Sequence, residues 1–393
     1  MKKVFLGLAL LTMLFVGGCQ KEEIAVDQAD QALELKSGDI IPGNYVVVYN
    51  ETPTMLRSIT GDYESRVTAM KAQSMNIFRD AGIAADAIKI AYSGTIYGVA
   101  AKLTAQEVRA LQNDRRIAYV EPDIIISLPE LRQESFATPE AQTTPWGITR
   151  VGGFANYTGT NRAWIIDTGI QSNHPDLNVD VANSKTFVPR SKNFEDENGH
   201  GTHVAGTVAA KNNDIGVVGV AAGAPVVAVR VLDRKGSGAY STIIAGVDYV
   251  GTKGVAGDVA NMSLGGPAYT ALDDAVKAAA NKGIRFTLAA GNESQNANNV
   301  SPARAYGTNI YTISAMATGN LWASFSNFAN PPIDYCAPGV SVLSCWIKST
   351  YKSISGTSMA APHAAGVLLL GNPTTDGYVQ NDPDGTPDPI IHR

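Results

Sequence analysis

The sequence is poor in cysteine and in charged side chains. Only three of its 393 residues are cysteine, and Asp, Glu, Lys and Arg together make up 17% of the chain. Three cysteines are too few for a scaffold held together by disulfides. The formal net charge of -5 gives no general attraction for nucleic acid, and the sequence shows no basic arm, zinc-ligand cluster or phosphate-binding loop. The apolar fraction of 45% is typical of a globular protein, and the length allows two domains.

The apolar run near the N-terminus is too short for a comfortable membrane span. It covers residues 4–16, follows a short basic start and is followed by Gly17, Gly18 and Cys19. This pattern predicts a signal peptide over residues 1–18. Its end resembles a bacterial lipobox, which implies cleavage before Cys19 and a lipid on that thiol. An ordinary cleaved signal that happens to contain a cysteine is the alternative.

Residues 19–42 are polar and are interpreted as a linker. Their first residues, 20–23, resemble the acidic export tag of some surface lipoproteins. We therefore expect an exported protein of the cell envelope, an outer-membrane lipoprotein that is exposed at the surface or else secreted.

Residues 43–128 alternate between strand and helix patterns, which predicts a small α+β domain. Tyr45–Tyr49 is rich in β-formers, and Thr104 and Glu107 form a capping box that predicts a helix over Ala105–Gln112. Residues 129–144 lack apolar periodicity and contain proline. They are interpreted as an exposed linker in which processing would occur.

Three polar residues occupy positions that suit chemistry. Asp167 ends an apolar strand pattern, at the carboxyl end where functional groups gather in an open α/β sheet. His200 lies between two glycines directly before a helical pattern, and the nearby His203 is either a competing base or a buried structural histidine. Ser358 begins an apolar helical pattern, where free N–H groups favour a developing negative charge. Taken alone, Asp167 is better explained as an ordinary turn aspartate at a strand end.

Three short segments together resemble, in chain order, the signatures of the subtilisin-like serine proteases: Asp167-Thr168-Gly169, His200-Gly201-Thr202-His203 and Gly356-Thr357-Ser358-Met359-Ala360. The resemblance is closest to the proteinase K branch. It implies a catalytic domain over residues 145–371, with a mostly parallel sheet and helices on both faces. It also implies that residues 43–128 are an inhibitory prodomain of ferredoxin-like α+β fold. A docking domain that stays attached is the alternative for this region.

The same resemblance assigns roles to residues. Ser358 would be the nucleophile, His200 the general base, Asp167 the orienting acid and Asn292 the oxyanion-hole amide. The substrate-binding residues that it implies are Gly236, Ser237, Gly238, Ser263, Leu264, Gly265, Ala289, Ala290 and Gly291. Their small side chains suggest a roomy site that prefers large apolar residues. Without the three signatures, these segments would be interpreted as ordinary glycine-rich loops.

Metal ligands and thiols give weaker signals. No cofactor is expected in the chemistry, and structural calcium is expected without a defined site; the candidates, all expected in exposed loops, are Asp176, Asp196 and Glu197. Residues 372–393 are interpreted as a solvated tail, whose acids do not match an EF-hand loop: Asp376, Asp382, Asp384 and Asp388. We expect Cys336 and Cys345 to be free thiols, because the extended segment between them would hold them too far apart for a bridge.

The sequence therefore predicts an exported, lipid-anchored serine endopeptidase, made as an autoprocessing zymogen and acting as a monomer on protein substrates. Its prodomain would inhibit it intramolecularly, and no nucleic acid is expected as a partner. Two alternatives remain open. One is a catalytically silent surface-binding protein of the same fold. The other is a narrow maturation protease, which would carry the same residues.

Overall fold

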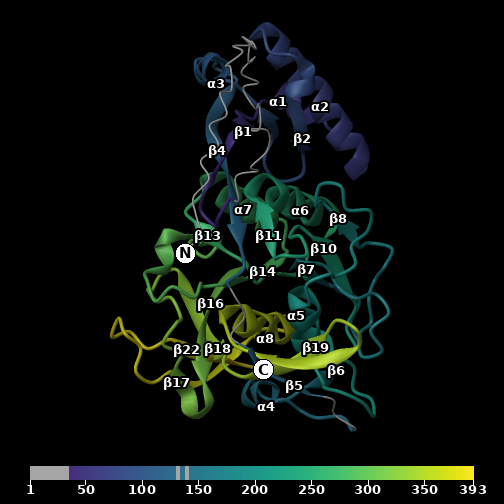
Figure 1. Cartoon of the computed structure of the whole chain (residues 1–393), viewed down its shortest axis with the longest axis vertical. Coiled ribbons are helices and arrows are strands. Elements are labelled where there is room, and N and C mark those ends of the chain that lie inside the picture. Colours follow the sequence, from purple (N-terminus) through teal and green to yellow (C-terminus); the bar gives the residue numbers. More distant parts are fainter. Residues whose placement is uncertain (1–34, 130–132, 138–140) are drawn as a thin grey trace, which may run out of the picture. The chain divides into compact units, whose positions relative to one another are not determined.

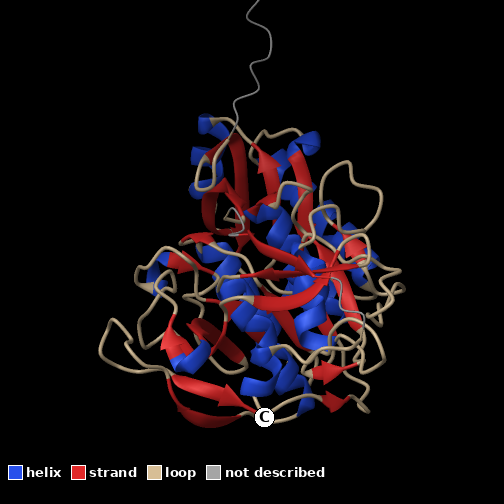
Figure 2. Cartoon of the chain, turned by 60° about the horizontal axis from the view of Figure 1, so that its bottom comes forward, coloured by secondary structure: helices blue, strands red, loops and turns tan. Residues whose placement is uncertain are grey.

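The computed structural model describes residues 35–129, 133–137 and 141–393. The predicted signal peptide, the lipobox and Cys19 lie outside the described residues. Within the described ranges, no helix combines the length and the apolar character that a membrane span requires. Figure 2 shows the helices and strands of this part of the chain.

The small α+β domain is present and has the predicted ferredoxin-like arrangement. Its four strands are ordered β4-β1-β3-β2 in an antiparallel sheet (Figure 1). The predicted capping box at Thr104 and Glu107 starts helix α3. The first helix, α1, and strand β2 were not predicted. The elements are β1 (Ile40–Tyr49), α1 (Pro53–Ser58), α2 (Tyr63–Asp80), a 3₁₀ turn (Ala85–Ala87), β2 (Ile88–Tyr92), β3 (Gly98–Lys102), α3 (Ala105–Gln112) and β4 (Ile117–Ser127).

The larger part of the chain is built on a mostly parallel sheet. In the described residues its strands run in the order β21-β22-β18-β16-β14-β12-β7-β10-β8. They are β7 (Ala163–Asp167), β8 (Lys185–Thr186), β10 (Val226–Arg230), β12 (Val259–Met262), β14 (Arg285–Ala289), β16 (Ile310–Ala317), β18 (Ile333–Pro338), β21 (Thr374–Tyr378) and β22 (Pro389–His392), with β17 (Leu321–Trp322) paired to β16.

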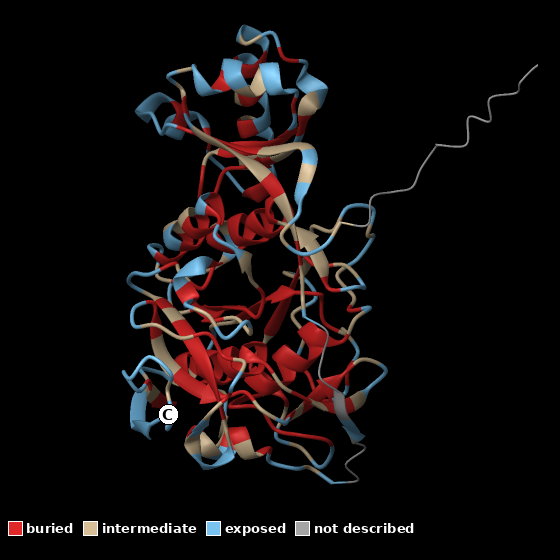
Figure 3. Ribbon diagram, turned by 60° about the vertical axis from the view of Figure 1, so that its left-hand side comes forward, coloured by how far each residue is buried: buried red, intermediate tan, exposed pale blue. Residues whose placement is uncertain are grey.

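Helices cover both faces of this sheet, and the alternation of side chains along each strand explains how. Trp164 and Ile166 of β7 pack with α6 and α7, whereas Ala163 and Ile165 pack with α5 and α8. The main helices are α4 (Trp146–Arg150), α5 (His200–Ala209), α6 (Tyr240–Lys253), α7 (Thr270–Ala280) and α8 (Thr357–Leu370). Buried residues concentrate on the central helices and strands (Figure 3).

Helix α8 is apolar all round because it is enclosed on every side. Every residue of it from Thr357 to Leu369 is buried. A helix without a polar face fits only inside a protein. Its first residues, which include Ser358, are therefore held in a fixed position.

Short strands complete the described fold. They are β5 (Gln133–Ala137), β6 (Ala155–Asn156), β9 (Ala221–Ala222), β11 (Ser237–Ala239), β13 (Gly266–Pro267), β15 (Val300–Ser301), β19 (Val342–Trp346) and β20 (Thr350–Ile354). Strands β19 and β20 form a hairpin to which β5 adds, and β11 pairs with β4 of the small domain.

Polar contacts join the small domain to helices α6 and α7. Asp248 of α6 accepts hydrogen bonds from the backbone N–H groups of three consecutive residues of the small domain, 93–95. In return, Glu121 accepts from the first N–H groups of α7, and Asp123 accepts from the backbone N–H and hydroxyl of Ser241 at the start of α6. Carboxylates at helix N-termini are stabilised by the positive end of the helix dipole.

The interpretation of residues 372–393 as a solvated tail was wrong. Strand β22 pairs in parallel with β18 of the main sheet, and Ile390 and Ile391 are fully buried. Asp388 is buried as well, and it accepts hydrogen bonds from Ser314 and Asn330. The segment is short in apolar residues, but these isoleucines complete the edge of the core.

The region 129–144, interpreted as an exposed linker, contains a strand that was not predicted. Strand β5 pairs antiparallel with β20, with Phe136 opposite Lys352. The expectation for the thiols was confirmed, since Cys336 and Cys345 are both free and buried.

The burial of Ile391 gives a test of the C-terminal strand. Replacing Ile391 by Ala should lower the free energy of unfolding by about 2–5 kcal/mol, because it removes buried methyl groups and leaves a cavity. Urea denaturation would measure this, with Ser358→Ala in all proteins so that the expected processing does not occur. Tyr378→Ala is the matched control, since Tyr378 is in the same segment but 65% exposed. Equal effects of the two changes would contradict the structure.

Candidate active site

Asp167 and His200 form the most strongly bonded pair of the site. Asp167 ends β7 with its carboxylate fully buried, and His200 begins α5. The Nδ1 atom of His200 lies 2.8 Å from Oδ1 and 2.9 Å from Oδ2 of Asp167. A carboxylate can only accept, so the imidazole donates from Nδ1 and its Nε2 is left to act as an acceptor.

This contact decides the protonation behaviour of His200. Burial is the largest single influence and lowers the pKa of the imidazole, but the charge of Asp167, its hydrogen bond and the charge of Asp196 together raise the pKa by more. The net effect is a raised pKa. The pair therefore favours the imidazolium form that exists after His200 accepts a proton.

Glycines allow the loop before α5 to come this close to its neighbours. A Cβ on Gly199 would lie 2.4 Å from the ring of Trp346, and one on Gly201 would lie 2.1 Å from the carbonyl oxygen of Gly169. Gly199 also has a φ of 114°, which other residues rarely adopt. These positions explain why His200 stands between two glycines.

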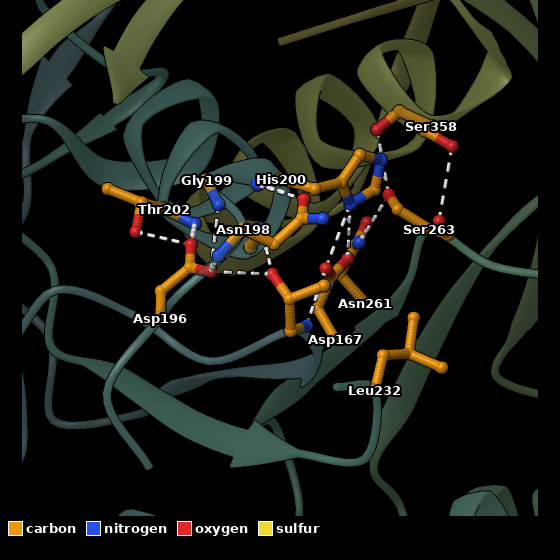
Figure 4. A network of polar contacts seen from close by, with 12 residues as sticks. Asp167, Asp196, Asn198, Gly199, His200, Thr202, Leu232, Asn261, Ser263 and Ser358 are labelled. Atoms are coloured by element: carbon orange, nitrogen blue, oxygen red, sulfur yellow. Dashed lines mark hydrogen bonds and ion pairs between the residues drawn. The ribbon is translucent and has the colours of Figure 1, made fainter. Parts of the chain in front are cut away.

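Asp196 fixes the same loop. Its carboxylate accepts from the backbone N–H groups of Asn198, Gly199 and Thr202, and from the hydroxyls of Thr168 and Thr202. The expectation that Asp196 lies in an exposed loop was therefore wrong. Its oxygens are already used to order the entry of α5 (Figure 4).

Ser358 is the second residue of α8 and approaches His200 from the other side. In Figure 4 the imidazole of His200 lies between Asp167 and Ser358. The Ser358 hydroxyl donates to the carbonyl oxygen of Ser263 at 3.1 Å, and the Ser263 hydroxyl donates to the Ser358 carbonyl at 2.7 Å. This exchange fastens the start of α8 to the end of β12.

Asn292 follows β14 and is oriented by the residue next to Ser358. Its Oδ1 atom accepts from the backbone N–H and the hydroxyl of Thr357, at 2.8 and 3.0 Å. With its oxygen held in this way, the amide has its NH₂ group as its remaining donor. Asn292 and Ser358 line the same cavity.

That cavity has a volume of about 550 Å³. Of the sequence-predicted binding residues, four line it: Leu264, Gly265, Ala289 and Gly291. Ala290 does not line it, because its side chain is buried in a separate cluster with Ala297 and Ile333. The prediction missed Glu293 and Gln295, which also line the cavity. Their position within three residues of Asn292 is the one sequence signal that could have indicated them.

Three further predicted binding residues, Gly236, Ser237 and Gly238, contact the end of strand β4, whereas Ser263 contacts Ser358. Ser237, Gly238 and Ala239 of β11 pair with Ser127, Ile126 and Ile125. The next residue, Leu128, donates its N–H to the carbonyl oxygen of Gly236 at 2.9 Å. Leu128 and Pro129 then line the cavity beside Ser358. A chain segment is thus bound along these glycines as an added strand.

The other candidates have structural surroundings. The Nε2 of His203 lies 3.0 Å from the carbonyl oxygens of Val342 and Lys352, and burial lowers the pKa of His203 to about 3. Asp176 is buried rather than exposed, and Glu197 forms an ion pair with Arg230. The described residues include no group of three or more His, Cys, Asp or Glu that could hold a metal ion.

Comparisons with family models and with known proteins give consistent results. Residues 164–374 match the model of the Subtilase family, and residues 44–129 match that of Peptidase inhibitor I9. The chain is 35% identical over 397 residues to an extracellular serine proteinase of Thermus sp. (strain Rt41A), covering 97% of this chain and 91% of that protein. It is 43% identical over 284 residues to subtilisin E of Bacillus subtilis (strain 168), covering 70% of each.

A solved structure shows the same fold. The crystal structure of a cold adapted subtilisin-like serine proteinase superposes with a TM-score of 0.54 at 35% identity, covering 63% of this chain and 97% of that one.

The contact between Asp167 and His200 can be tested by titration. Nitrogen NMR of the imidazoles, in the Ser358→Ala protein, should give His200 a pKa above its ordinary value of about 6.5. Asp167→Asn removes the charge and leaves burial, so the pKa of His200 should fall below about 6.5. His203 is the internal control and should stay neutral in both proteins above about pH 5. An unchanged titration of His200 in Asp167→Asn would show that the carboxylate does not control it.

Proposed function

Because this chain belongs to the subtilase family, we propose that it is a serine endopeptidase in which Ser358, His200 and Asp167 act as a catalytic triad. The observation that supports this most strongly is the paired hydrogen bond from His200 to a buried carboxylate, on the side of the ring away from Ser358. This is the arrangement that a base needs in order to accept a proton from a serine.

In the proposed reaction, the Ser358 oxygen forms a bond to the carbonyl carbon of a peptide while its proton passes to Nε2 of His200. The negative charge on the former carbonyl oxygen is held by the Ser358 N–H and the NH₂ of Asn292. The intermediate then loses the amine, which takes the proton from His200, and an acyl-enzyme remains. A water molecule then attacks the acyl-enzyme through the same steps and releases the carboxylic acid. All of these groups are supplied by the chain itself.

We also propose that residues 43–128 are the inhibitory prodomain of a zymogen, that residues 129–144 carry the processing site and that the catalytic domain comprises the predicted residues 145–371 together with β21 and β22 of the main sheet. The match to an inhibitor family over residues 44–129 supports the first assignment. The pairing of β4 with β11 supports the inhibitory role, because it fills with backbone the groove where an extended substrate would bind. The same residues, Gly236 to Gly238 and Ser263 to Gly265, would hold substrates after release.

Several finer features belong to the same proposal. The small residues Ala289 and Gly291 support a preference for large apolar side chains, which a peptide-library profile with strict Arg or Lys selection would refute. The motif ending at Cys19 supports a lipid anchor in the cell envelope, and a palmitate analogue should label the wild type and not Cys19→Ser. Structural calcium and membership of the proteinase K branch remain proposals that rest on resemblance.

The nucleophile gives the first functional prediction. Purified residues 20–393 should lose the prodomain mass on a gel and then degrade casein, because cleavage in cis and in trans use the same hydroxyl. Ser358→Ala should stay at full length and leave casein intact. If both proteins are trimmed alike, another protease does the processing. If the folded wild type neither trims itself nor cleaves casein, the hypothesis of a catalytically silent surface-binding protein is favoured instead.

The oxyanion donor gives the second. Asn292→Ala should lower kcat about 10²–10³-fold with a small change in KM, because the amide binds charge that develops only in the transition state; that magnitude was established for a member of this family. Steady-state kinetics on a peptide substrate would measure it. Asn298→Ala, an exposed asparagine on the following turn, is the matched control. A change confined to KM would assign Asn292 to ground-state binding.

A further inference from the structure

Strand β5 follows β4 in the chain, and it pairs with β20, the strand that precedes Ser358. Strand β4 approaches along β11 and brings Leu128 and Pro129 to the cavity beside Ser358. Residues 133–137 form β5, which pairs antiparallel with β20. The pairing runs from Gln133 opposite Ile354 to Ala137 opposite Tyr351. Strand β20 ends at Ile354, four residues before Ser358, so the strand edge on which β5 lies leads toward the nucleophile in the chain.

The edge of β20 carries an unusual cation. Lys352 is only 4% exposed, and the described part of the chain gives its ammonium no ion pair. Its Nζ instead lies 4.3 Å from the ring centre of Trp346 and 5.3 Å from that of Phe136. Burial lowers the pKa of this ammonium. Ring faces attract cations, so both aromatic residues compensate a charge that water reaches poorly.

The two rings differ in what they depend on. Trp346 is in the same hairpin as Lys352, packs against Gly199 beside His200 and is part of the core. Phe136 comes from β5, directly opposite Lys352, and is 66% exposed. If β5 leaves, the cation loses one of its two rings while the shelf formed by Trp346 and Lys352 stays in place.

We propose that the edge of β20, with the shelf of Trp346 and Lys352, is a binding site for the part of a peptide that follows the scissile bond, and that it selects an aromatic side chain. In the uncut chain β5 is its occupant and Phe136 the selected residue. In the processed enzyme an extended substrate binds in the same register. This inference rests on the proposed protease function, and it adds a second held segment to the one formed by β4.

A binding site of this kind helps the chain to cut itself. Backbone pairing of β4 with β11 and of β5 with β20 fixes the chain on both flanks of residues 130–132. Such pairing reduces the entropy that the chain must lose before Ser358 can attack it. Loosening β5 should therefore slow processing even though no residue near Ser358 is changed. The effect should require both partners of the contact, Phe136 and Lys352.

A double-mutant cycle on the full chain tests this. Phe136→Leu keeps an apolar side chain without an aromatic face, and Lys352→Met keeps an unbranched side chain without the charge. Each should slow the first-order release of the prodomain about two- to fivefold, and the double variant should be no slower than the slower single one. Lys348→Met, an exposed lysine in the same hairpin, is the control. Near-ultraviolet circular dichroism in the Ser358→Ala background checks that each variant folds.

A comparison of two substrates on the same enzyme separates binding at this site from any effect of a mutation on the folding of the enzyme. Two peptides of residues 124–137 would carry either phenylalanine or cyclohexylalanine, which has a similar size but no aromatic face, at the position of Phe136. The processed enzyme should show a KM about two- to fivefold lower for phenylalanine, and Lys352→Met should bring the ratio of KM values close to one.

Equal KM values, or single variants that process at the wild-type rate, would overturn the proposal. The protease assignment would still stand in either case, because it depends on the loss of processing in Ser358→Ala. Effects that multiply in the double variant would also overturn it, since they would show that Phe136 and Lys352 act separately.

Discussion

The arrangement of the site depends on the fully buried carboxylate of Asp167. Removing an ion from water is costly unless hydrogen bonds or an opposite charge compensate it. Asp167 receives two close approaches from Nδ1 of His200 and one backbone N–H from Thr168. Burial makes the charged carboxylate of Asp167 costly to desolvate. It also makes the effect of this charge on the pKa of His200 large, because little water screens the charge.

The positions of the other groups follow from this pair. His200 must begin a helix so that its ring reaches Asp167, and Asp196 orders the turn that starts that helix. Ser358 lies on the far side of the ring, at the start of α8, whose residues from Thr357 to Leu369 are enclosed by the core. Each element is positioned by packing or hydrogen bonds outside the reacting atoms.

The positions of the main site residues could largely be predicted from short sequence motifs. Asp167, His200 and Ser358 stand in segments where nearly every residue is constrained by contact with its neighbours, so the pattern is visible in a single sequence. The helix over Ala105–Gln112 was predictable for the same reason, since a capping box is local. The ferredoxin-like and parallel-sheet folds came with the resemblance and were confirmed by strand order and by the similar solved structure.

The errors concern contacts between residues far apart in the chain. Ile390 and Ile391 are two apolar residues in a segment rich in Pro and Asp, and their burial depends on an open sheet edge at β18. Strand β5 depends on β20 in the same way. Ala290 was expected at the cavity with its neighbours, but successive residues of an extended chain face opposite sides, and it points into the core.

The contact between the small domain and helices α6 and α7 combines apolar side chains with polar groups, and this has a consequence for the expected processing. Tyr63, Tyr92 and Ile126 are buried in one cluster with apolar residues of α6 and α7. Carboxylates of both parts accept hydrogen bonds across the same contact. Burial of apolar surface stabilises an association whether or not the two partners are covalently joined. A cut between the two parts would therefore leave the small domain bound as a noncovalent partner, and its departure would require a separate step.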